Sequence, residues 1–599
     1  MSKIQTEIGT VYSVNGNSVA VSMADSVKSN SPIIDGIVYR IGQIGSFLKI
    51  PLGYTSLYGI VTQIGADAIP DKISEAIKGN FNLLGNQQWL SMTLVGEQIG
   101  QRFERGISQS PTTGDAVHIV TLQDLEIVYG GYDEHSSINI GHISVSESLN
   151  AYLDLDKLVS RHFTILGSTG SGKSNAVGIT LKSIIQKKFG RTRVLLLDPH
   201  GEYNSVFGKD SEVFRVNADK NANHLHIPYW ALSFQELIEL FGGNISEQNK
   251  EYFRTKVLEA KQKGAVANDI NIDPAMISAD SPIPFSLKQL WFELDDFERQ
   301  TYTVNNDPTT PALKKAGDAE MLVSNQYIPA GSGNTAPFLN KSAKFILPFL
   351  DSIRTKLHDR RFDFLFQPGE YAPDLSGKIA KDLSELLFSW IGSEKPITIL
   401  DISDVPSDIM MSIAGTLLNI TYEALFWGQE VKVGGRKQPL LIVLEEAHNY
   451  LRAGENSIAS RNVQRIAKEG RKYGVGLMLV TQRPSELDET VLSQCGTIIA
   501  LRMNNSKDRG YVSAAIQDEL RSIVDLLPSL RTGEAIVSGE GVSIPSRIQF
   551  NKLANAPKSA DPVVSKQWNQ PYAQSEDDYK KLLSLWRNKK FEMEEEVDE

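Results

Sequence analysis

Hydrophobic and polar positions alternate along the first part of the chain. Residues 11–23, "VYSVNGNSVAVSM", alternate around Asn15-Gly16, which predicts a β-hairpin with a type I′ turn. Short β-rich stretches such as "YRIGQIGSFLKI", "WLSMTLVGEQI" and "AVHIVTL" follow, separated by Gly, Pro and Asp. Many short strands at modest spacing predict a small β-barrel or sandwich. The stretch contains no cluster of catalytic residue types, so we interpret it as an interaction module.

From about Gly141 the apolar positions gather into compact runs. A strand in "HFTILG" is followed by a Gly-rich loop, a helix to about Lys188 and a second strand in "RVLLLDPHGEY". This order predicts a βαβ unit and therefore a parallel sheet. Further buried strands are predicted at 397–402, 439–446, 475–482 and 496–503. The fold class expected is α/β, with a RecA-like P-loop core.

Between about 230 and 390 the pattern is helical. Ser233 and Glu236 form a capping box before "LIELFGG", and residues 246–264 and 341–359 have helical periodicity. The expected domains are an N-terminal β-barrel, two parts of the ATPase core around a helical insertion, and a C-terminal helical extension with an acidic tail. Their predicted ranges are 1–135, 136–230, 231–390, 391–555 and 556–599.

Composition and charge narrow the class of protein. The 599 residues are 41% hydrophobic and 22% charged, which is typical of a globular protein, and the net charge of -11 argues mildly against a surface coated with nucleic acid. The only cysteine, Cys495, excludes an intrachain disulfide and fits a reducing compartment. We see no signal peptide and no apolar run near the ~20 residues of a membrane span, so we expect a cytoplasmic protein without a membrane segment. The acidic end, "FEMEEEVDE", is interpreted as a solvated terminus.

The stretch from Gly167 to Ser174 matches the phosphate-loop pattern G-x-x-x-x-G-K-[ST] between a strand and a helix. Its glycines allow the backbone to surround phosphate oxygens at a helix N-terminus. Lys173 is expected to reach the β- and γ-phosphates of ATP, and Ser174 is expected to bind Mg²⁺. The predicted nucleotide-binding residues are Gly167, Ser168, Thr169, Gly170, Ser171, Gly172, Lys173, Ser174 and Asn175.

Hydrolysis also needs carboxylates at neighbouring strand ends, and "LLIVLEEAH" supplies two. Glu446 is predicted to orient and activate the attacking water, and Glu445 to support Mg²⁺ directly or through water. Asp198 is also a predicted metal ligand, although Asp198 and Glu202 could equally cap a turn. Gln482, at the end of the next strand, is predicted to sense the γ-phosphate; the alternative is an ordinary loop amide.

Several motifs together resemble a family. "LLLDPHGEY", "LLIVLEEAHNYL", "IAKEGRKYGVGLMLVTQRPSELD" and "LRTGEAIV", with the phosphate loop, are similar to the HerA ATPases of the HerA/FtsK superfamily. "YRIGQIGSFLKIPLG" and "FERGISQSPTTGDAVHIVT" resemble the barrel domain of that family. The likeness runs from about residue 5 to 550. The combination of "DPHGEY" with "EGRKYG" and "TQRPSE" is specific, whereas the phosphate loop alone is not.

The resemblance implies a hexameric ring that threads double-stranded DNA through a central pore. It further implies that Arg161 is an arginine finger acting on the neighbour's nucleotide and that Arg471 is a second, nucleotide-sensing arginine. A cation is needed at the γ-phosphate during transfer, and an arginine supplied by a neighbour couples hydrolysis to subunit contact. The alternatives are a surface side chain at a strand start for Arg161 and a helix-terminal charge for Arg471.

The cations that follow the strand of Glu446 are candidates for the pore. Repeated six times, they would form a basic channel that contacts phosphates without base readout. An ordinary solvated helix face is an equally good interpretation. The residues are Arg452, Arg461, Arg465 and Lys468.

The function expected is an ATP-driven, helicase-like ring that translocates double-stranded DNA. The alternative is a ring ATPase scaffold that assembles and activates a partner enzyme without processive translocation. The resemblance suggests partners such as a NurA-type nuclease or an antiviral effector, for example a sirtuin-like NAD hydrolase, docked on the barrel. A small-molecule kinase is disfavoured because no acceptor-binding lid is evident, and no nuclease constellation is present in the sequence.

Overall fold

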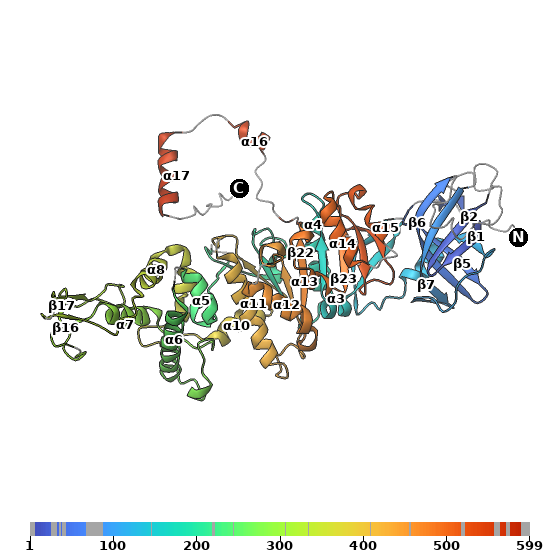
Figure 1. Ribbon diagram of the computed structural model, residues 1–599. Helices are drawn as coiled ribbons and strands as arrows, with labels where there is room; N and C mark the ends of the chain where they lie inside the picture. Colours follow the sequence, from blue (N-terminus) through green and yellow to red (C-terminus); the bar gives the residue numbers. More distant parts are fainter. Residues whose placement is uncertain are drawn as a thin grey trace.

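A computed structural model describes the chain over most of its length. The described residues are 6–24, 33–34, 37–38, 44–66, 88–144, 146–218, 222–242, 245–305, 307–332, 335–407, 409–454, 457–516, 521–555, 557, 564–570 and 575–588. Figure 1 shows an elongated molecule with the N-terminal strands at one end and a group of helices at the other. The predicted solvated acidic tail lies outside the described residues.

The N-terminal strands form a small β-barrel. The sheet order is β2-β1-β9-β5-β6-β7-β8, and an additional β2–β7 pairing closes six strands into a ring. Alternate side chains such as Ile8, Val19 and Leu90 fill the interior. The strands are β1 (Glu7–Asn15), β2 (Ser18–Met23), β5 (Phe47–Leu52), β6 (Thr55–Ala66), β7 (Gln88–Ile99), β8 (Arg102–Arg105) and β9 (Ala116–Ile119).

The first hairpin forms as expected, but its turn differs from the prediction. β1 and β2 are antiparallel and Asn15 pairs with Ser18, so the central residues are Gly16 and Asn17 rather than Asn15 and Gly16. Gly16 has φ +60°, whereas Asn17 has no positive φ. A positive φ at the first central residue alone is the pattern of a type II′ turn, so the type I′ prediction is wrong. The glycine decides the register because it adopts this conformation without a steric penalty.

The core is a twelve-stranded sheet in the order β11-β10-β25-β24-β23-β12-β22-β21-β13-β20-β14-β15. From β23 to β15 all neighbours are parallel, while β11, β10, β25 and β24 add an antiparallel edge. The α/β class with a parallel P-loop core is therefore confirmed. The strands are β10 (Ser137–Ile143), β11 (Ser146–Asp154), β12 (Phe163–Leu166), β13 (Val194–Asp198), β14 (Ser211–Arg215), β15 (Asn223–His224), β20 (Ile397–Asp401), β21 (Leu440–Leu444), β22 (Val475–Thr481), β23 (Thr497–Leu501), β24 (Glu534–Gly539) and β25 (Ser546–Phe550).

Helices cover both faces of this sheet. On one face, Leu196 of β13 and Val443 of β21 pack with α4 (Lys173–Gln186). On the other face, Leu197 and Leu444 pack with α11 (Met410–Trp427) and α12 (Ile458–Glu469). Successive strand residues point to opposite faces, so strands buried on both sides are continuously apolar.

The segment between β15 and β20 is a helical insertion whose core is continuous with the α11 face of the sheet. The capping box of Ser233 and Glu236 is present as expected at the start of α5. Small β-pairs between α7 and α8 form the far end of the molecule in Figure 1. The helices are α5 (Phe234–Phe241), α6 (Glu247–Ala267), α7 (Leu287–Arg299), α8 (Leu347–His358), α9 (Asp363–Phe366) and α10 (Leu383–Ile391).

Arg105 fixes the barrel to the core. This residue ends β8, and its guanidinium donates hydrogen bonds to the carbonyls of Gly539 (2.6 Å), Val542 (2.7 Å) and Ser543 (2.6 Å). Burial of part of the guanidinium against the core lowers the pKa of Arg105, although the residue as a whole remains exposed. The chain ends in α16 (Val564–Trp568) and α17 (Glu576–Asn588). No described helix is long and apolar enough to cross a membrane.

Candidate active site

The phosphate loop joins β12 to α4 and depends on its glycines. Gly170 and Gly172 have φ +72° and +96°, a region that disfavours side chains. A Cβ on Gly167 would lie 2.9 Å from Cβ of Leu501, and a Cβ on Gly172 would lie 2.9 Å from the backbone nitrogen of Gly533. The loop therefore cannot accept larger residues at these positions without shifting the adjacent strands.

The loop fits a nucleotide's phosphate groups. The first backbone N–H groups of α4 have no hydrogen-bond acceptor within the helix, and the helix dipole favours an anion at this end. A Cβ on Gly170 would meet no atom within 4 Å, so the loop has open space on that side. Ser171 Oγ is buried without a hydrogen-bond partner among the described residues. Asn175 instead uses its side chain to bind the backbone of Asn551 and Leu553, which leaves its backbone N–H for a phosphate.

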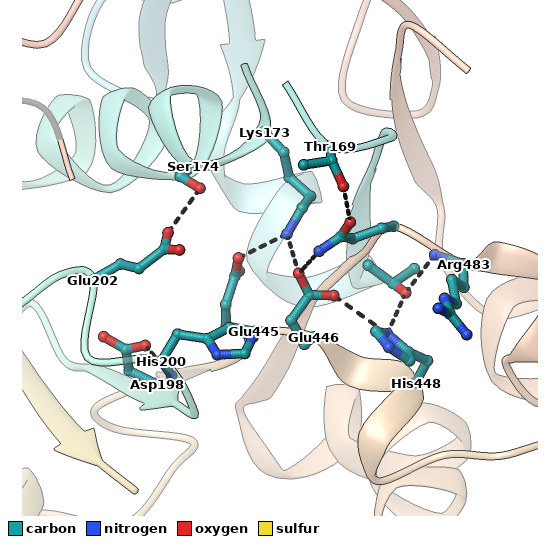
Figure 2. Close-up of polar contacts among 12 residues, drawn as sticks. Thr169, Lys173, Ser174, Asp198, His200, Glu202, Glu445, Glu446, His448 and Arg483 are labelled. Atoms are coloured by element: carbon teal, nitrogen blue, oxygen red, sulfur yellow. Dashed lines mark hydrogen bonds and ion pairs between the residues drawn. The ribbon is translucent and has the colours of Figure 1, made fainter. Parts of the chain in front are cut away.

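Lys173 lies between the two predicted carboxylates (Figure 2). Its Nζ donates to Glu445 Oε1 at 2.9 Å and to Glu446 Oε1 at 2.7 Å, and all three residues are buried. Burial opposes the charge of the lysine, but the two glutamates outweigh it and raise the lysine's pKa. The parallel strands β12 and β21 end at the same edge of the sheet, which brings these distant residues together.

Glu446 is held in a strained and highly specified position. Its backbone is left-handed, with φ 47° and ψ 50°, a conformation that is uncommon for residues other than glycine and clusters at functional sites. Gln482 Nε2 donates to its Oε1 at 2.6 Å, and Thr169 Oγ1 donates to Gln482 Oε1 at 2.6 Å. Burial would raise the pKa of Glu446, but the contact with His448 and the hydrogen bonds from Lys173 and Gln482 lower it to about 2. The carboxylate is therefore ionised at neutral pH.

His448 and Thr481 belong to this network, and neither was singled out from the sequence. His448 Nδ1 lies 3.3 Å from Glu446 Oε2 and 3.0 Å from Thr481 Oγ1 (Figure 2). The histidine follows Glu446 by two residues, in a 3-10 turn (Ala447–Asn449) that returns toward the strand ends. The motif "EEAH" could have indicated that His448 is close to Glu446. The spacing of the residues alone, however, does not show whether the turn directs the histidine toward the carboxylate.

Glu445 has the opposite electrostatic character. Burial raises its pKa to about 7, although Lys173 pulls the pKa downward. Its Oε2 has no hydrogen-bond partner among the described residues. An unsatisfied, buried carboxylate oxygen beside the phosphate loop fits a bound cation that would supply the missing interaction.

Asp198 and Glu202 have different environments. Both oxygens of Asp198 accept backbone N–H groups, from His200 (3.1 Å), Gly201 (2.9 Å) and Tyr203 (3.0 Å), which is the turn-capping arrangement. Burial raises the pKa of Asp198 to about 6. Glu202 Oε2 instead accepts the hydroxyl of Ser174 at 3.0 Å. The geometry thus brings Glu202, rather than Asp198, to the predicted metal-binding hydroxyl.

The oxygen atoms beside the phosphate loop suit an Mg²⁺ ion that nucleotide phosphates and water help to hold, rather than a metal ion held by protein side chains alone. Among the described residues no group of three His, Cys, Asp or Glu side chains is arranged around a common metal position. Ser174, Glu202 and Glu445 offer oxygen atoms beside the phosphate loop. Mg²⁺ is typically held by one or two such groups together with substrate phosphates and water.

The predicted arginines do not join this cluster. Arg161 ends α3 (Leu155–Arg161), directly before β12, and its Nε lies 3.5 Å from Glu540 Oε2. Arg471 lies in a 3-10 turn (Gly470–Tyr473) directly before β22. Arg161 precedes β12, and the phosphate loop follows that strand. Arg471 precedes β22, and Gln482 follows that strand. The two arginines are therefore at the amino edge of the sheet, away from the chain's own phosphate loop.

The pore candidates also differ from one another. Arg465 on α12 forms an ion pair with Glu423 and stacks over Tyr422 and Phe426 at 5.1 and 4.8 Å. Arg461 and Lys468, on the same helix, are exposed. Arg452, which precedes this helix, is exposed as well. Arg465 is thus engaged within the subunit, whereas the three exposed cations keep both interpretations open.

This fold and this cluster define a P-loop ATPase. Comparison with known families assigns residues 138–420 to "Helicase HerA, central domain" and residues 413–593 to "Helicase HerA-like C-terminal". The two matches together span residues 138–593, so the chain belongs to the HerA family of helicase-type ATPases. The resemblance inferred from the motifs is confirmed to that level.

Individual relatives are similar over most of their length. The "DNA double-strand break repair helicase HerA" of Pyrococcus furiosus is 26% identical over 507 residues, covering 79% of this chain and 82% of that protein. A "Probable DNA double-strand break repair helicase HerA" of Methanocaldococcus jannaschii is 28% identical, covering 75% and 83%. Among solved structures, VirB4 of Thermoanaerobacter pseudethanolicus matches with TM-score 0.45 and 13% identity, covering 71% of this chain and 99% of that one.

Proposed function

We propose that this HerA-family ATPase forms a homohexameric ring that couples Mg²⁺-dependent ATP hydrolysis to translocation of double-stranded DNA. The observation that carries the ring is the separation of the two arginines from their own phosphate loop. Between Arg471 and Gln482 lies β22, whose seven residues span roughly 23 Å. An arginine at that distance cannot reach the chain's own γ-phosphate, but in a ring it can face the nucleotide of a neighbour.

Each polar group at the carboxyl edge has a role in this proposal. Bound ATP supplies the phosphoryl group that is transferred to water. The loop N–H groups and Lys173 bind its phosphates, and Ser174, Glu202 and Glu445 hold Mg²⁺ directly or through water. Glu446 is placed to accept a proton from the attacking water, because its carboxylate is ionised and is positioned by Gln482 and His448. Transfer of Lys173 to phosphate removes one of the contacts that lower the pKa of Glu446.

Lys173 has to change partners for this reaction. Its Nζ now binds Glu445 and Glu446, and phosphate oxygens would compete with both carboxylates for the ammonium. Movement of the lysine toward phosphate frees Glu446 for water and Glu445 for the cation. Gln482 connects Glu446 to Thr169 of the loop, so it is placed to report whether a γ-phosphate is present.

DNA as the substrate is supported by the family and by the printed names of its relatives, which are helicases of double-strand break repair. Arg461 and Lys468 are exposed on α12 and would repeat six times in a ring. Cations that bind phosphates without base contacts suit a motor that moves along any sequence.

The second candidate is a scaffold that activates a partner enzyme, and one feature of the barrel favours a docking role. Tyr54, in the tight turn between β5 and β6, is fully exposed, and Ile99 at the end of β7 is 48% exposed. Thr55 pairs with Ile99, so the two apolar side chains lie near one another at the same rim. An aromatic anchor on a rigid rim suits a protein partner such as a NurA-type nuclease or an antiviral effector like a sirtuin-like NAD hydrolase.

One pair of measurements tests the proposal. Native mass spectrometry of the purified chain should show six copies, and ATP hydrolysis should increase on addition of double-stranded DNA but not in Lys173→Ala. A ring whose hydrolysis responds to a co-purifying protein and not to DNA would favour the scaffold. A monomer that hydrolyses ATP at full rate would contradict the ring altogether.

A further inference from the structure

A second cavity lies at the opposite edge of the core sheet from the phosphate loop. Its volume is about 580 Å³, within the range typical of small-molecule sites. It opens between α3, the end of α4 and the amino ends of β13, β21 and β22. Much of its lining is apolar, from residues that include Leu155, Val159, Ile184, Val194, Leu441 and Val475.

A buried arginine lines this apolar cavity. Arg193 is 7% exposed, and its guanidinium donates to the carbonyls of Val433 (3.1 Å) and Gln438. Its Nε has no hydrogen-bond partner among the described residues. Burial lowers the pKa of Arg193 to about 10, with no carboxylate opposing that shift. A buried cation held by neutral carbonyls alone is unfavourable unless an anion compensates it.

The rim adds to the positive charge. Arg191, Arg436 and Arg471 line the cavity together with one acid, Asp156. Arg436 Nη1 forms an ion pair with Glu430 Oε1 at 2.5 Å, but Glu430 does not line the cavity. Phe189 also lines the cavity, and its side chain is 45% exposed. The cavity therefore combines an apolar floor with an excess of cations.

We propose that this cavity binds a small amphipathic organic anion, with its apolar body against Val159, Ile184 and Leu441 and its acidic group toward Arg193 and Arg191. The ligand class follows from two requirements. The apolar lining selects a hydrophobic body, and the uncompensated guanidinium selects a carboxylate, sulfonate or phosphate. This site is distinct from the chain's own ATP site, because the chain's own phosphate loop lies across the sheet at the carboxyl edge. It shares Arg471 with the edge that we propose to face a neighbour's nucleotide.

The probe for this site is 1-anilinonaphthalene-8-sulfonate, an aromatic anion whose fluorescence rises in apolar surroundings. We expect one saturable site per chain in the purified, nucleotide-free protein. Arg191→Gln should weaken it about tenfold, the loss of one charge-assisted hydrogen bond. Val159→Trp, which fills the cavity, should abolish it. Lys209→Gln, which removes an exposed cation outside the cavity, is the matched control and should leave binding unchanged.

Three results would overturn the proposal. One is equal probe binding in the wild type and in both cavity variants, which would assign the signal to exposed surface elsewhere. Another is equally tight binding of the uncharged parent, N-phenyl-1-naphthylamine, because the arginines would then play no part. The third is binding by the dissociated chain but not by the assembled protein, which would mean that a second copy covers the cavity. Arg191 is exposed, so its variant remains informative even where Val159→Trp lowers the melting temperature.

Discussion

Gln482 Nε2 donates a 2.6 Å hydrogen bond to Glu446 Oε1, the same oxygen that accepts Lys173 Nζ at 2.7 Å. One carboxylate oxygen thus connects the phosphate-binding lysine with the residue placed to sense the γ-phosphate. The second oxygen contacts His448. Because its backbone is also left-handed, Glu446 can neither rotate nor shift without breaking several of these contacts.

Glu446→Gln should bind ATP normally but hydrolyse it about 100-fold more slowly or worse, because an amide cannot accept the proton of the attacking water. Lys173→Ala should abolish hydrolysis and weaken binding. Nucleotide affinity and steady-state phosphate release measure the two effects separately. Near-normal turnover in Glu446→Gln, with loss in Glu445→Gln instead, would move the general base by one residue.

Arg161→Ala should leave ATP binding intact and reduce hydrolysis by about 1,000-fold, the usual effect of an arginine finger. Mixed with Lys173→Ala, it should regain some activity, since each chain supplies what the other lacks at a shared site. Glu540→Gln is the matched control because it removes the ion pair of Arg161 but keeps the arginine. No recovery in demonstrably mixed rings would argue against action across the interface.

Glu202→Gln and Asp198→Asn should separate metal binding from loop stability. Glu202→Gln should raise the Mg²⁺ concentration needed for tight binding of a fluorescent ATP analogue, with little change in melting temperature. Asp198→Asn should lower the free energy of unfolding by about 1–3 kcal/mol, because one of its buried N–H partners loses its acceptor. The reverse pattern would restore Asp198 as the metal ligand predicted from the sequence.

Lys261 provides a test by pH. The side chain is fully buried on α6, its Nζ donates to the Ser281 carbonyl at 2.6 Å, and burial lowers its pKa to about 7. The unfolded chain keeps the usual pKa near 10.5, so between these values the unfolded state binds more protons and stability rises with pH.

The wild type should therefore gain about 1.4 kcal/mol per pH unit between pH 7 and 10 relative to Lys261→Met, and nothing below pH 7. Urea unfolding of both proteins at several pH values measures this difference. Lys263→Met, on the exposed side of the same helix, should show no such trend. A pH-independent difference would mean that Lys261 stays charged in the folded protein.

Tyr54→Ser should weaken capture of a partner protein and leave ATP hydrolysis and hexamer mass unchanged. The reason is that the exposed ring lies in a barrel turn, far along the chain from every phosphate-binding residue. Phe345→Ser, at an 87% exposed site in the helical insertion, is the matched control. Partner capture that survives Tyr54→Ser but is lost in Phe345→Ser would assign docking to the insertion instead.

The sequence by itself determined the elements whose signals are local. Apolar runs predicted the strands β12, β13, β21, β22 and β23, because a strand buried on both faces has no polar positions. The phosphate loop followed from its glycines and Lys173, since its conformation depends on residues adjacent in the chain. The location of Glu445 and Glu446 near the phosphate loop followed from strands that end at one edge of the sheet, whereas their ion pairs with Lys173 were not predicted.

Tertiary structure decided what depends on the direction of a side chain or on contacts distant in sequence. Asp198 and Glu202 are both acids after β13, and only the folded loop turns one toward backbone N–H groups and the other toward Ser174. His448 reaches Glu446 because a 3-10 turn brings it back, and β2 closes the barrel by pairing with β7. The cavity around Arg193 arises where separate strands and helices fail to fill the space between them, and no local pattern along the chain encodes that space.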